Sequence, residues 1–544
     1  MVSFPVWARR AALAALFVFA AVCEAQTAKR FMVAAAHPLA AEAGYSVLNL
    51  GGSAVDAAIA VQMVLGLVEP ESSGIGGGAF MLHWDERLKL LQTYDGRETA
   101  PAASLPERFL DAAGKPMPFM DAVVGGRAVG VPGVLRMLEL AHRRHGKLRW
   151  GELFQYAVFA AEEGFLMSRR LHEQLGRETH LRRDPAAARL YYQADGTPKP
   201  VGARIVNRAY GAALRAIALQ GAEAFYTGEI GRDIVKAVRE HANAGDLTEQ
   251  DLAGYRARER EPVCGQYVRT RVCSMGPPSS GGIAVLQILR ILEHAEFPLA
   301  APRSADAVHM FSEAGRLAFA DRARYVGDPD FIKVPVERLL ADIYLRDRAG
   351  LIREHSMHRA SPGDVESTGT SHFTIVDAAG NAVAMTTTIE STFGSRIMVR
   401  GFLLNNQLTD FDFVPRQANS VYANKRPRSS MAPTMVFRDG SLVLALGSPG
   451  GPNIINYVAK TLVGTLQWGL DIQSAIALPN FGSRNGPTLL ERGTEAEKML
   501  GELEKRRHEL EVTPLVSGLH GIERIPGGWR GGADPRRDGV VRGD

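Results

Sequence analysis

The clearest alternation of hydrophobic and polar positions lies in the last third of the chain. Residues 371–377 (SHFTIVD) and 381–388 (NAVAMTTT) are two short runs, separated by the three residues 378–380 (AAG). β-branched and aromatic residues favour strands, and a three-residue loop ending in glycine is typical of a hairpin with a G1 bulge. Counting outward from this loop places Thr370 opposite Thr388. The pattern therefore predicts two hydroxyl groups facing each other at the open end of a hairpin.

Most of the remaining chain shows helical patterns. Residues 54–67 are apolar on nearly every face, which predicts a buried helix, and Ser53 is suited to cap its first turn. Further helices are expected at 38–50, 133–143, 150–163, 208–220, 228–244, 283–292, 304–325, 339–351, 454–466 and 494–510, and further strands at 79–84, 434–437 and 442–446. The helices between residues 133 and 244 are interpreted as scaffold.

Composition narrows the class of protein. The chain has 544 residues, of which 46% are hydrophobic and 22% charged, as in globular proteins with a large core. Lys and Arg number 63 against 59 Asp and Glu, a net charge of +4. This balance argues against a nucleic-acid partner. The three cysteines form no CxxC spacing and no HExxH motif is present, so a metal site is not expected.

The N-terminus has the features of a signal peptide. Arg9 and Arg10 precede the apolar run 11–22, and Cys23 and Ala25 are small residues at the cleavage positions. The run is too short to span a bilayer comfortably. We expect a signal peptide at residues 1–25 and a periplasmic or secreted protein. Lipidation at Cys23 and a twin-arginine signal are weaker alternatives, because the flanking residues fit them poorly.

Cys264 and Cys273 flank a predicted hairpin. A two-residue turn at Val268-Arg269 would place them directly opposite each other, within the Cα separation that a disulfide accepts. Export would bring them into an oxidising compartment. The alternative is two small buried hydrophobic residues that happen to face each other.

Three further motifs carry candidate chemistry. The glycine-rich residues 74–78 lack a GK[ST] signature and lead into a strand, which favours close backbone packing over nucleotide binding. Arg97 could form a surface salt bridge or clamp a carboxylate. Residues 447–451 (GSPGG) lie between a strand and a helix, so their backbone N–H groups suit either an oxyanion hole or a plain turn.

These motifs together resemble those of the γ-glutamyltranspeptidase (glutathione hydrolase) family. The resemblance runs in order along nearly all of the chain after residue 25. It rests on Asp56-Ala57-Ala58, Glu69-Pro70 to Gly78, Asp95-Gly96-Arg97, Pro277 to Gly282, Thr370-Ser371-His372-Phe373, Asn405-Asn406-Gln407, Lys425-Arg426-Pro427 with Ser429-Ser430, and Gly447 to Gly451. Several motifs in the same order are far more specific than any one of them.

The resemblance implies a mixed α/β (α+β) fold, the four-layer αββα sandwich of the N-terminal-nucleophile hydrolases. It also implies a proenzyme that cuts itself between Gly369 and Thr370. The products would be a large subunit, residues 26–369, and a small subunit, residues 370–544, which stay together as a heterodimer. A threonine hydroxyl is a weak nucleophile that needs a base, and the α-amine freed by cleavage titrates near neutral pH.

The resemblance further assigns roles to individual residues. Thr370 would be the nucleophile, and Thr388 would hydrogen-bond it, in agreement with the hairpin count. The other roles are α-carboxylate binding by Arg97, Ser429 and Ser430, α-ammonium binding by Glu390, Gln407 and Asp410, and oxyanion N–H donation by Gly450 and Gly451. Position 390 is asparagine in some members; glutamate can also accept a hydrogen bond from an ammonium group.

The implied reaction is transfer of a γ-glutamyl group from glutathione, or another γ-glutamyl compound, to water, an amino acid or a dipeptide. No metal or organic cofactor is implied. A cephalosporin or glutaryl acylase of the same fold and a catalytically silent exported binding protein are the alternatives. The segment 411–424 is shorter than in members with a lid over the substrate, which predicts an open cleft.

Overall fold

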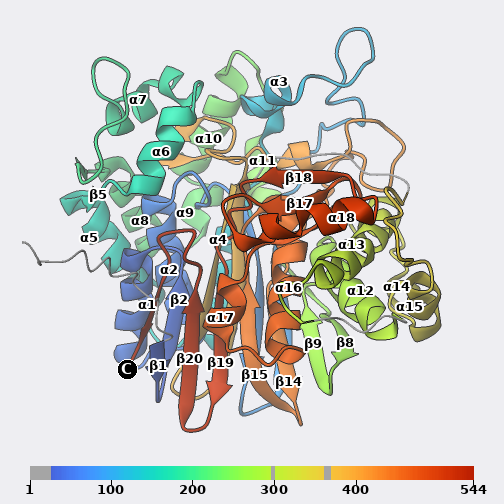
Figure 1. Ribbon diagram of the computed structural model, residues 1–544. Coiled ribbons are helices and arrows are strands. Elements are labelled where there is room, and N and C mark those ends of the chain that lie inside the picture. Colours follow the sequence, from blue (N-terminus) through green and yellow to red (C-terminus); the bar gives the residue numbers. More distant parts are fainter. Residues whose placement is uncertain (1–25, 296–300, 361–368) are drawn as a thin grey trace, which may run out of the picture.

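The structure is a computed structural model that describes residues 26–295, 301–360 and 369–544 (Figure 1). The predicted signal peptide lies outside the described residues, as does most of the polar segment that precedes Gly369. Within the described ranges, no helix combines the length and the apolar character needed to cross a membrane.

Two antiparallel sheets of seven strands each form the centre of the molecule. The first sheet has the order β21 (Val540–Gly543), β2 (Met32–Ala35), β10 (Gly369–Val376), β11 (Ala382–Glu390), β3 (Gly78–Asp85), β4 (Leu90–Gly96) and β7 (Arg258–Arg260). The second has the order β1 (Gln26–Ala28), β20 (Gly528–Ala533), β19 (His520–Ile525), β15 (Ser441–Gly447), β14 (Thr434–Arg438), β9 (Thr270–Ser274) and β8 (Val263–Tyr267).

The central strands of the first sheet are buried on both faces, because their successive side chains point into two different cores. On β3, Phe80 and Leu82 pack in the core that the two sheets share, whereas Met81 packs in the core beneath the helices. Successive side chains of a strand point to opposite faces, so a strand buried on both faces is apolar throughout. β10 and β11 lie in the middle of this sheet and contact β15 and β19 of the second sheet.

Helices cover the outer face of each sheet, which completes the four-layer αββα arrangement. The first sheet is covered by α1 (Pro38–Asn49), α2 (Ala54–Val68) and α4 (Val134–His145), and the second by α12 (Gly281–His294), α16 (Ile454–Leu466) and α17 (Ile472–Ala477). Further out, α5 (Gln155–Glu163) packs on α2 and on α8 (Arg208–Gln220), and α13 (Ala305–Tyr325) packs on α12. Figure 1 shows α1 and α2 beside β2, with α12 and α13 on the opposite side of the molecule. The predicted fold is therefore confirmed.

The other helices and strands lie outside these layers or form smaller sheets. The helices are α3 (Phe119–Val123), α6 (Arg169–Arg177), α7 (Pro185–Tyr191), α9 (Glu223–Tyr226), α10 (Glu229–Glu240), α11 (Glu249–Gly254), α14 (Val336–Leu339), α15 (Asp342–Ala349) and α18 (Leu500–Lys505). The strands are β5 (Phe165–Leu166), β6 (Arg204–Ile205), β12 (Met398–Val399), β13 (Phe402–Leu403), β16 (Phe481–Ser483), β17 (Thr488–Glu491) and β18 (Leu510–Thr513).

The hairpin predicted from the hydrophobic pattern is confirmed. Gly380 has φ 84°, the left-handed conformation expected at the end of the loop. Thr370 pairs with Thr388, whereas Gly369 pairs with Glu390, so the register shifts by one residue at this point. The shift leaves Ile389 as a bulge, at the end of the hairpin where the two threonines meet.

The predicted helix at 494–510 is wrong in its second half. α18 ends at Lys505, Arg507 has φ 61°, and Leu510 begins β18, which pairs in parallel with β17. Tertiary contacts override the helical pattern here. His508 is buried against His309, with 2.7 Å between Nε2 of His508 and Nδ1 of His309.

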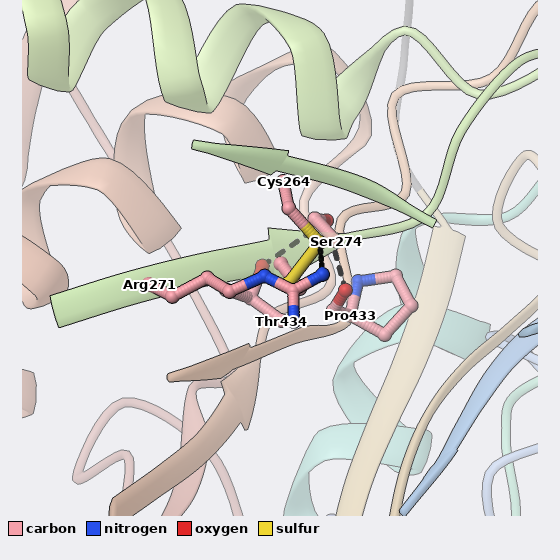
Figure 2. Close-up of a disulfide and its surroundings, with 6 residues drawn as sticks. Cys264, Arg271, Ser274, Pro433 and Thr434 are labelled. Carbon is pink, nitrogen blue, oxygen red and sulfur yellow. Dashed lines mark hydrogen bonds between the residues drawn. A yellow bond between two sulfur atoms is a disulfide. The ribbon is translucent and has the colours of Figure 1, made fainter. Parts of the chain in front are cut away.

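Cys264 and Cys273 form a disulfide across the β8–β9 hairpin (Figure 2). They are directly paired with a Cα separation of 4.1 Å. Val268 and Arg269 have φ 43° and 59°, as a two-residue type I′ turn requires. Both the pairing and the bond confirm the prediction from the sequence.

We expect the purified protein to have no alkylatable thiol at these two positions without a reductant. Alkylation followed by mass spectrometry of the 264–273 peptide measures this directly. Reduction before alkylation is the control and should add two labels. Two labelled cysteines in the unreduced sample would contradict the bond.

Candidate active site

A cleft opens where the β10–β11 hairpin ends. Its walls come from the start of β10, the end of β11, Arg97 after β4, Arg322 of α13, and three segments that follow β11 in the chain. The lining residues are Arg97, Arg322, Thr370, Thr388, Glu390, Gln407, Asp410, Arg428, Ser429, Ser430, Met431, Gly451, Pro452 and Ile454. Tertiary structure thus gathers segments that are separated by more than 300 residues in the sequence.

Two threonine hydroxyls form the floor of this cleft. Oγ1 of Thr370 lies 3.2 Å from Oγ1 of Thr388, and both residues are buried. The backbone N–H of Glu390 donates to Oγ1 of Thr388 at 2.9 Å. Either threonine hydroxyl can be the donor in the contact between them. The arrangement orients Thr370 and can stabilise a negative charge developing on its oxygen.

Glu390 stands beside the threonine pair in an unusual backbone conformation. Its φ is 78°, in the left-handed region that non-glycine residues rarely occupy. The Asn406 side-chain amide donates to the Glu390 carboxylate, and both residues are buried. Such conformations concentrate at functional sites, where surrounding contacts maintain them. Here the bulge at Ile389 and the contact with Asn406 hold the Glu390 carboxylate at the cleft.

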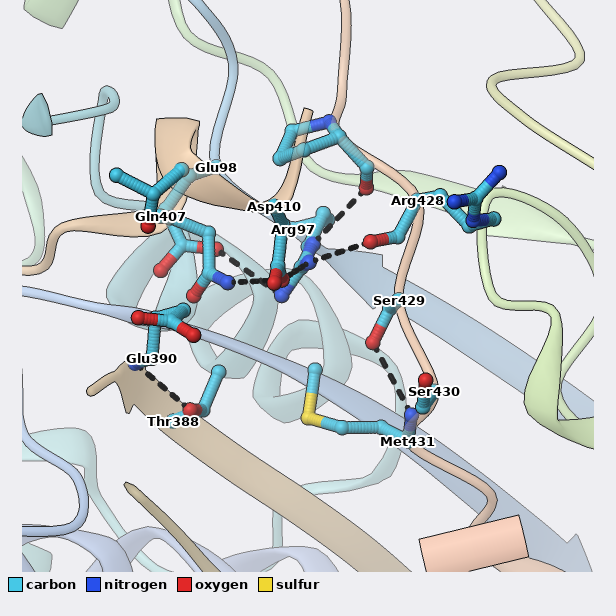
Figure 3. Close-up of polar contacts among 12 residues, drawn as sticks. Arg97, Glu98, Thr388, Glu390, Gln407, Asp410, Arg428, Ser429, Ser430 and Met431 are labelled. Atoms are coloured by element: carbon cyan, nitrogen blue, oxygen red, sulfur yellow. Dashed lines mark hydrogen bonds and ion pairs between the residues drawn. The ribbon is translucent and has the colours of Figure 1, made fainter. Parts of the chain in front are cut away.

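A buried arginine and a carboxylate face each other across the cleft wall (Figure 3). Nη2 of Arg97 forms an ion pair with Oδ2 of Asp410, and Nε2 of Gln407 donates to the same oxygen at 2.6 Å. Arg97 also donates to the backbone carbonyls of Pro427 and Arg428, at 3.1 and 3.0 Å. Arg97 is therefore a rigid cation with its counter-charge at the cleft, rather than a surface salt bridge.

Ser429 and Ser430 continue the cleft wall from Arg428. The backbone carbonyl of Ser429 accepts hydrogen bonds from the backbone N–H of Ser280 at 2.8 Å and from its hydroxyl at 2.6 Å. Nη2 of Arg322 donates to the hydroxyl of Ser430 at 2.8 Å, and Nε of Arg322 donates to the hydroxyl of Ser280 at 2.8 Å. Arg322 of α13 thereby holds both serine-bearing segments in place.

The glycine-rich turn after β15 closes the cleft. Gly450 has φ 132° and Gly451 has φ 53°, so both adopt conformations that favour glycine. A side chain at Gly450 would also meet the ring of Tyr457, with its Cβ 2.5 Å from Cε2. Gly451 lines the cleft directly, whereas Gly450 lies one residue outside the lining.

Nine of the ten residues predicted from the sequence line this cleft: all except Gly450. Sequence reasoning missed Arg322, Arg428 and Asn406, which touch or support the predicted residues. Arg322 belongs to an unremarkable helical pattern, and only its burial in the structure distinguishes it. Asn406 stood inside a recognised motif, and its polar side chain next to the predicted ligand Gln407 was an available signal.

The profile of the family described as gamma-glutamyltranspeptidase matches residues 40–543. The chain belongs to the γ-glutamyltranspeptidase family. It is 36% identical over 537 residues to the glutathione hydrolase proenzyme of Bacillus subtilis (strain 168), covering 94% of this chain and 91% of that protein.

Solved structures agree with this γ-glutamyltranspeptidase assignment. The cephalosporin acylase of Bacillus halodurans has a TM-score of 0.86 and 28% identity, covering 96% of this chain and 97% of that chain. The γ-glutamyltranspeptidase of Helicobacter pylori has a TM-score of 0.55 and 34% identity, covering 58% of this chain and 90% of that one. The chain thus has the fold of the N-terminal-nucleophile hydrolases.

One carboxyl group lies behind Arg97, outside the cleft. Oε2 of Glu98 is 3.9 Å from Nη1 of Arg97, and neither carboxyl oxygen has a hydrogen-bond partner among the described residues. Burial raises the pKa of Glu98 to about 8, although Arg97 opposes the shift. Glu98 therefore keeps its proton at neutral pH, which leaves Asp410 as the charged partner of Arg97.

We expect Glu98 to make the folded protein less stable at alkaline pH. Its pKa in the folded state is above the unfolded value of 4.5, so the free energy of unfolding falls as pH rises from 4.5 through about 8. Glu98→Gln should remove this loss and stabilise the protein at pH 9 by on the order of a few kcal/mol relative to pH 5.

Thermal denaturation at pH 5 and pH 9, in a Thr370→Ala background that keeps the chain whole, measures this difference. The exposed Glu107→Gln serves as the matched control and should have no effect at either pH. An equal effect of Glu98→Gln at both values would contradict the assignment.

His309, Glu313 and His508 form the one group in the described residues with metal-ligand spacing. Their polar atoms already bond one another or neighbouring residues. Nε2 of His309 must donate to the carbonyl of Arg353 at 2.7 Å, which leaves Nδ1 to accept from His508 at 2.7 Å. Glu313 accepts from Arg316 at 2.7 Å. Hydrogen bonding accounts for this cluster without a metal.

Proposed function

We propose that this protein is a glutathione hydrolase and γ-glutamyltransferase with Thr370 as its N-terminal nucleophile. The observation that carries the proposal is the meeting of Arg97, Asp410 and Glu390 beside the Thr370–Thr388 pair. One cation and two carboxylates match the carboxylate and ammonium groups of an α-amino acid. A γ-glutamyl donor has such a group at one end and its reactive carbonyl at the other.

Self-cleavage frees the α-amine of Thr370, which is the base of the mature site. In the continuous chain, Oγ1 of Thr370 attacks the carbonyl carbon of Gly369, a C–O bond forms, and the C–N bond to Thr370 breaks. The hydroxyl proton passes to the nitrogen that becomes the α-amine of Thr370. Water then hydrolyses the ester, giving a carboxylate on Gly369 and restoring the hydroxyl. After removal of the predicted signal peptide, residues 1–25, the large subunit is residues 26–369 and the small subunit is residues 370–544.

The mature site then performs acyl transfer. The α-amine of Thr370 takes the hydroxyl proton as Oγ1 attacks the γ-carbonyl carbon of the donor. Backbone N–H groups at Gly450 and Gly451 stabilise the oxyanion, and the leaving amine takes the proton. Water, an amino acid or a dipeptide attacks the resulting γ-glutamyl ester and frees Thr370.

Substrate binding divides the internal ion pair of the empty cleft. The α-carboxylate of the donor binds Arg97, Ser429 and Ser430 in place of Asp410. The α-ammonium group of the donor binds Asp410, Gln407 and Glu390. Each charge of the site keeps a partner throughout, which avoids the cost of a buried unpaired ion.

The structural similarity to an acylase supports a second candidate function, that of a cephalosporin or glutaryl acylase. The similarity to a cephalosporin acylase covers 96% of the chain, and such an enzyme uses the same nucleophile on a donor without an α-ammonium group. A silent binding protein is the third candidate. Incubation with a γ-glutamyl anilide separates them, since only γ-glutamyl transfer releases the aniline. Repeating the assay with a dipeptide acceptor separates transfer from hydrolysis.

We expect the cleft to admit bulky donors. No residue between 411 and 424 lines it, and Phe413 in this segment instead stacks on Phe109 with a centroid distance of 4.6 Å. A series of γ-glutamyl amides with leaving groups of increasing size should therefore show kcat/KM values within about tenfold of that for glutathione. A steep decline with size would contradict an open cleft.

A further inference from the structure

The C-terminal turn reaches the nucleophile from behind the cleft. β20 belongs to the second sheet and β21 to the first, so residues 534–539 cross from one sheet to the other. β21 pairs with β2, with Val540 opposite Ala35. This crossing brings the turn to the end of β2, next to the start of β10.

The backbone carbonyl of Thr370 depends on this turn. In the described structure, β2 pairs with β10 only from Phe373 to Val376, so β2 offers no N–H to Thr370. Nη1 of Arg537 donates to the Thr370 carbonyl at 3.1 Å. Arg537 of the turn thus supplies the hydrogen bond to the Thr370 carbonyl that β2, which ends before this point, cannot supply.

The side chain of Arg537 passes through a narrow space beside Gly518 and Pro449. A Cβ atom at Gly518 would lie 2.8 Å from Cδ of Arg537 and 2.6 Å from Cγ of Pro449. Only glycine therefore leaves room for the arginine stem at this point. Pro449 belongs to the turn that closes the cleft, so Arg537 packs beside the loop proposed to bind the oxyanion.

A buried cluster of charges accompanies Arg537. Glu69 accepts a hydrogen bond from the Ser371 hydroxyl at 2.7 Å. Nε of Arg170 lies 3.2 Å from the Glu71 carboxylate and 3.7 Å from that of Glu69. None of the four charged residues lines the cleft. Burial and Arg170 lower the pKa of Arg537 to about 10, against the influence of Glu69, so Arg537 remains a cation at neutral pH.

We propose that Arg537 is a positioning residue for the nucleophile Thr370. Glu69 is a second positioning residue, because it holds the hydroxyl of the neighbouring Ser371. This inference rests on the proposed function. The Thr370 carbonyl, held by Arg537, limits rotation about the Cα–C bond and keeps the hydroxyl against Thr388. The constraint matters most after self-cleavage, because Thr370 is then a chain end and has lost the pairing of Gly369 with Glu390.

The test compares Arg537→Met and Arg537→Lys with the parent. Cell-free synthesis followed by gels gives the rate of self-cleavage, and a γ-glutamyl anilide gives kcat and KM. Arg537→Met should slow self-cleavage and lower kcat by about tenfold or more, with KM within about twofold, because the substrate-binding residues are untouched. Arg537→Lys should recover part of both rates.

Arg536→Lys is the matched control, since Arg536 lies in the same turn but pairs with Glu491 and Asp534. It should leave both rates near those of the parent. Parental self-cleavage and kcat in Arg537→Met would overturn the inference. If Arg537→Met lacks a cooperative thermal transition, Arg537→Lys decides, and an unchanged kcat overturns it.

The outcomes also separate this inference from the proposed function. A parent that cleaves itself but releases no aniline overturns the γ-glutamyl assignment, and the self-cleavage rates of the variants still decide the role of Arg537. A parent that stays uncut overturns both.

Discussion

Thr370→Ala is expected to leave a single uncut chain, whereas the parent should run as two bands on a denaturing gel. The alanine lacks the hydroxyl that, in the proposed function, both attacks Gly369 and accepts the γ-glutamyl group. Activity on a γ-glutamyl anilide should fall by on the order of a thousandfold or more. N-terminal sequencing of the smaller parental band should begin at Thr370.

Thr370→Ser is the matched control, because it keeps a hydroxyl in the same place. It should still cleave itself and retain measurable turnover. The Thr370–Thr388 contact of 3.2 Å predicts that Thr388→Ala slows both reactions without abolishing them. A small band that begins at another residue would refute the nucleophile assignment, whatever the activity of the variants.

Asp410→Asn is expected to distinguish a γ-glutamyl enzyme from an acylase. The α-ammonium group is the only difference between a γ-glutamyl and a glutaryl donor. A hydrogen bond to a charged group contributes about 1.5–3 kcal/mol. Its loss should therefore lower kcat/KM for γ-glutamyl donors by about tenfold to a hundredfold. Glutaryl donors should lose little or gain, since they bring no cation to meet a buried carboxylate.

The ion pair between Arg97 and Asp410 sharpens this expectation. In the variant, Arg97 loses its counter-charge in the empty cleft, so any donor carboxylate meets an uncompensated cation. Both kinds of donor gain from this change, but only a γ-glutamyl donor also loses the charged partner of its ammonium group, so the net gain is expected for glutaryl donors. Asp412→Asn is the matched control, because Asp412 lies two residues further along and does not line the cleft. Equal losses on both donors in Asp410→Asn would show that Asp410 supports the fold and does not recognise the ammonium group.

The sequence by itself determined the features that depend on neighbouring residues. The Gly380 loop sets the register of the β10–β11 hairpin, so counting residues was enough to pair Thr370 with Thr388. The same local logic placed Cys264 opposite Cys273. Ordered motifs, rather than any single spacing, identified the family and most of the cleft residues.

Tertiary structure alone decided the contacts between distant segments. No sequence pattern joins Arg322 to Ser430 or Arg537 to Thr370, because these pairs are separated by 108 and 167 residues. Tertiary contacts also decided the second half of the 494–510 segment, which was predicted to be helical but is not. Burial of His508 there outweighed the local helical propensity. Local preferences amount to a few tenths of a kcal/mol per residue, whereas burial and pairing of a polar side chain involve about 1–3 kcal/mol. Long-range contacts therefore set the geometry in which the motifs act.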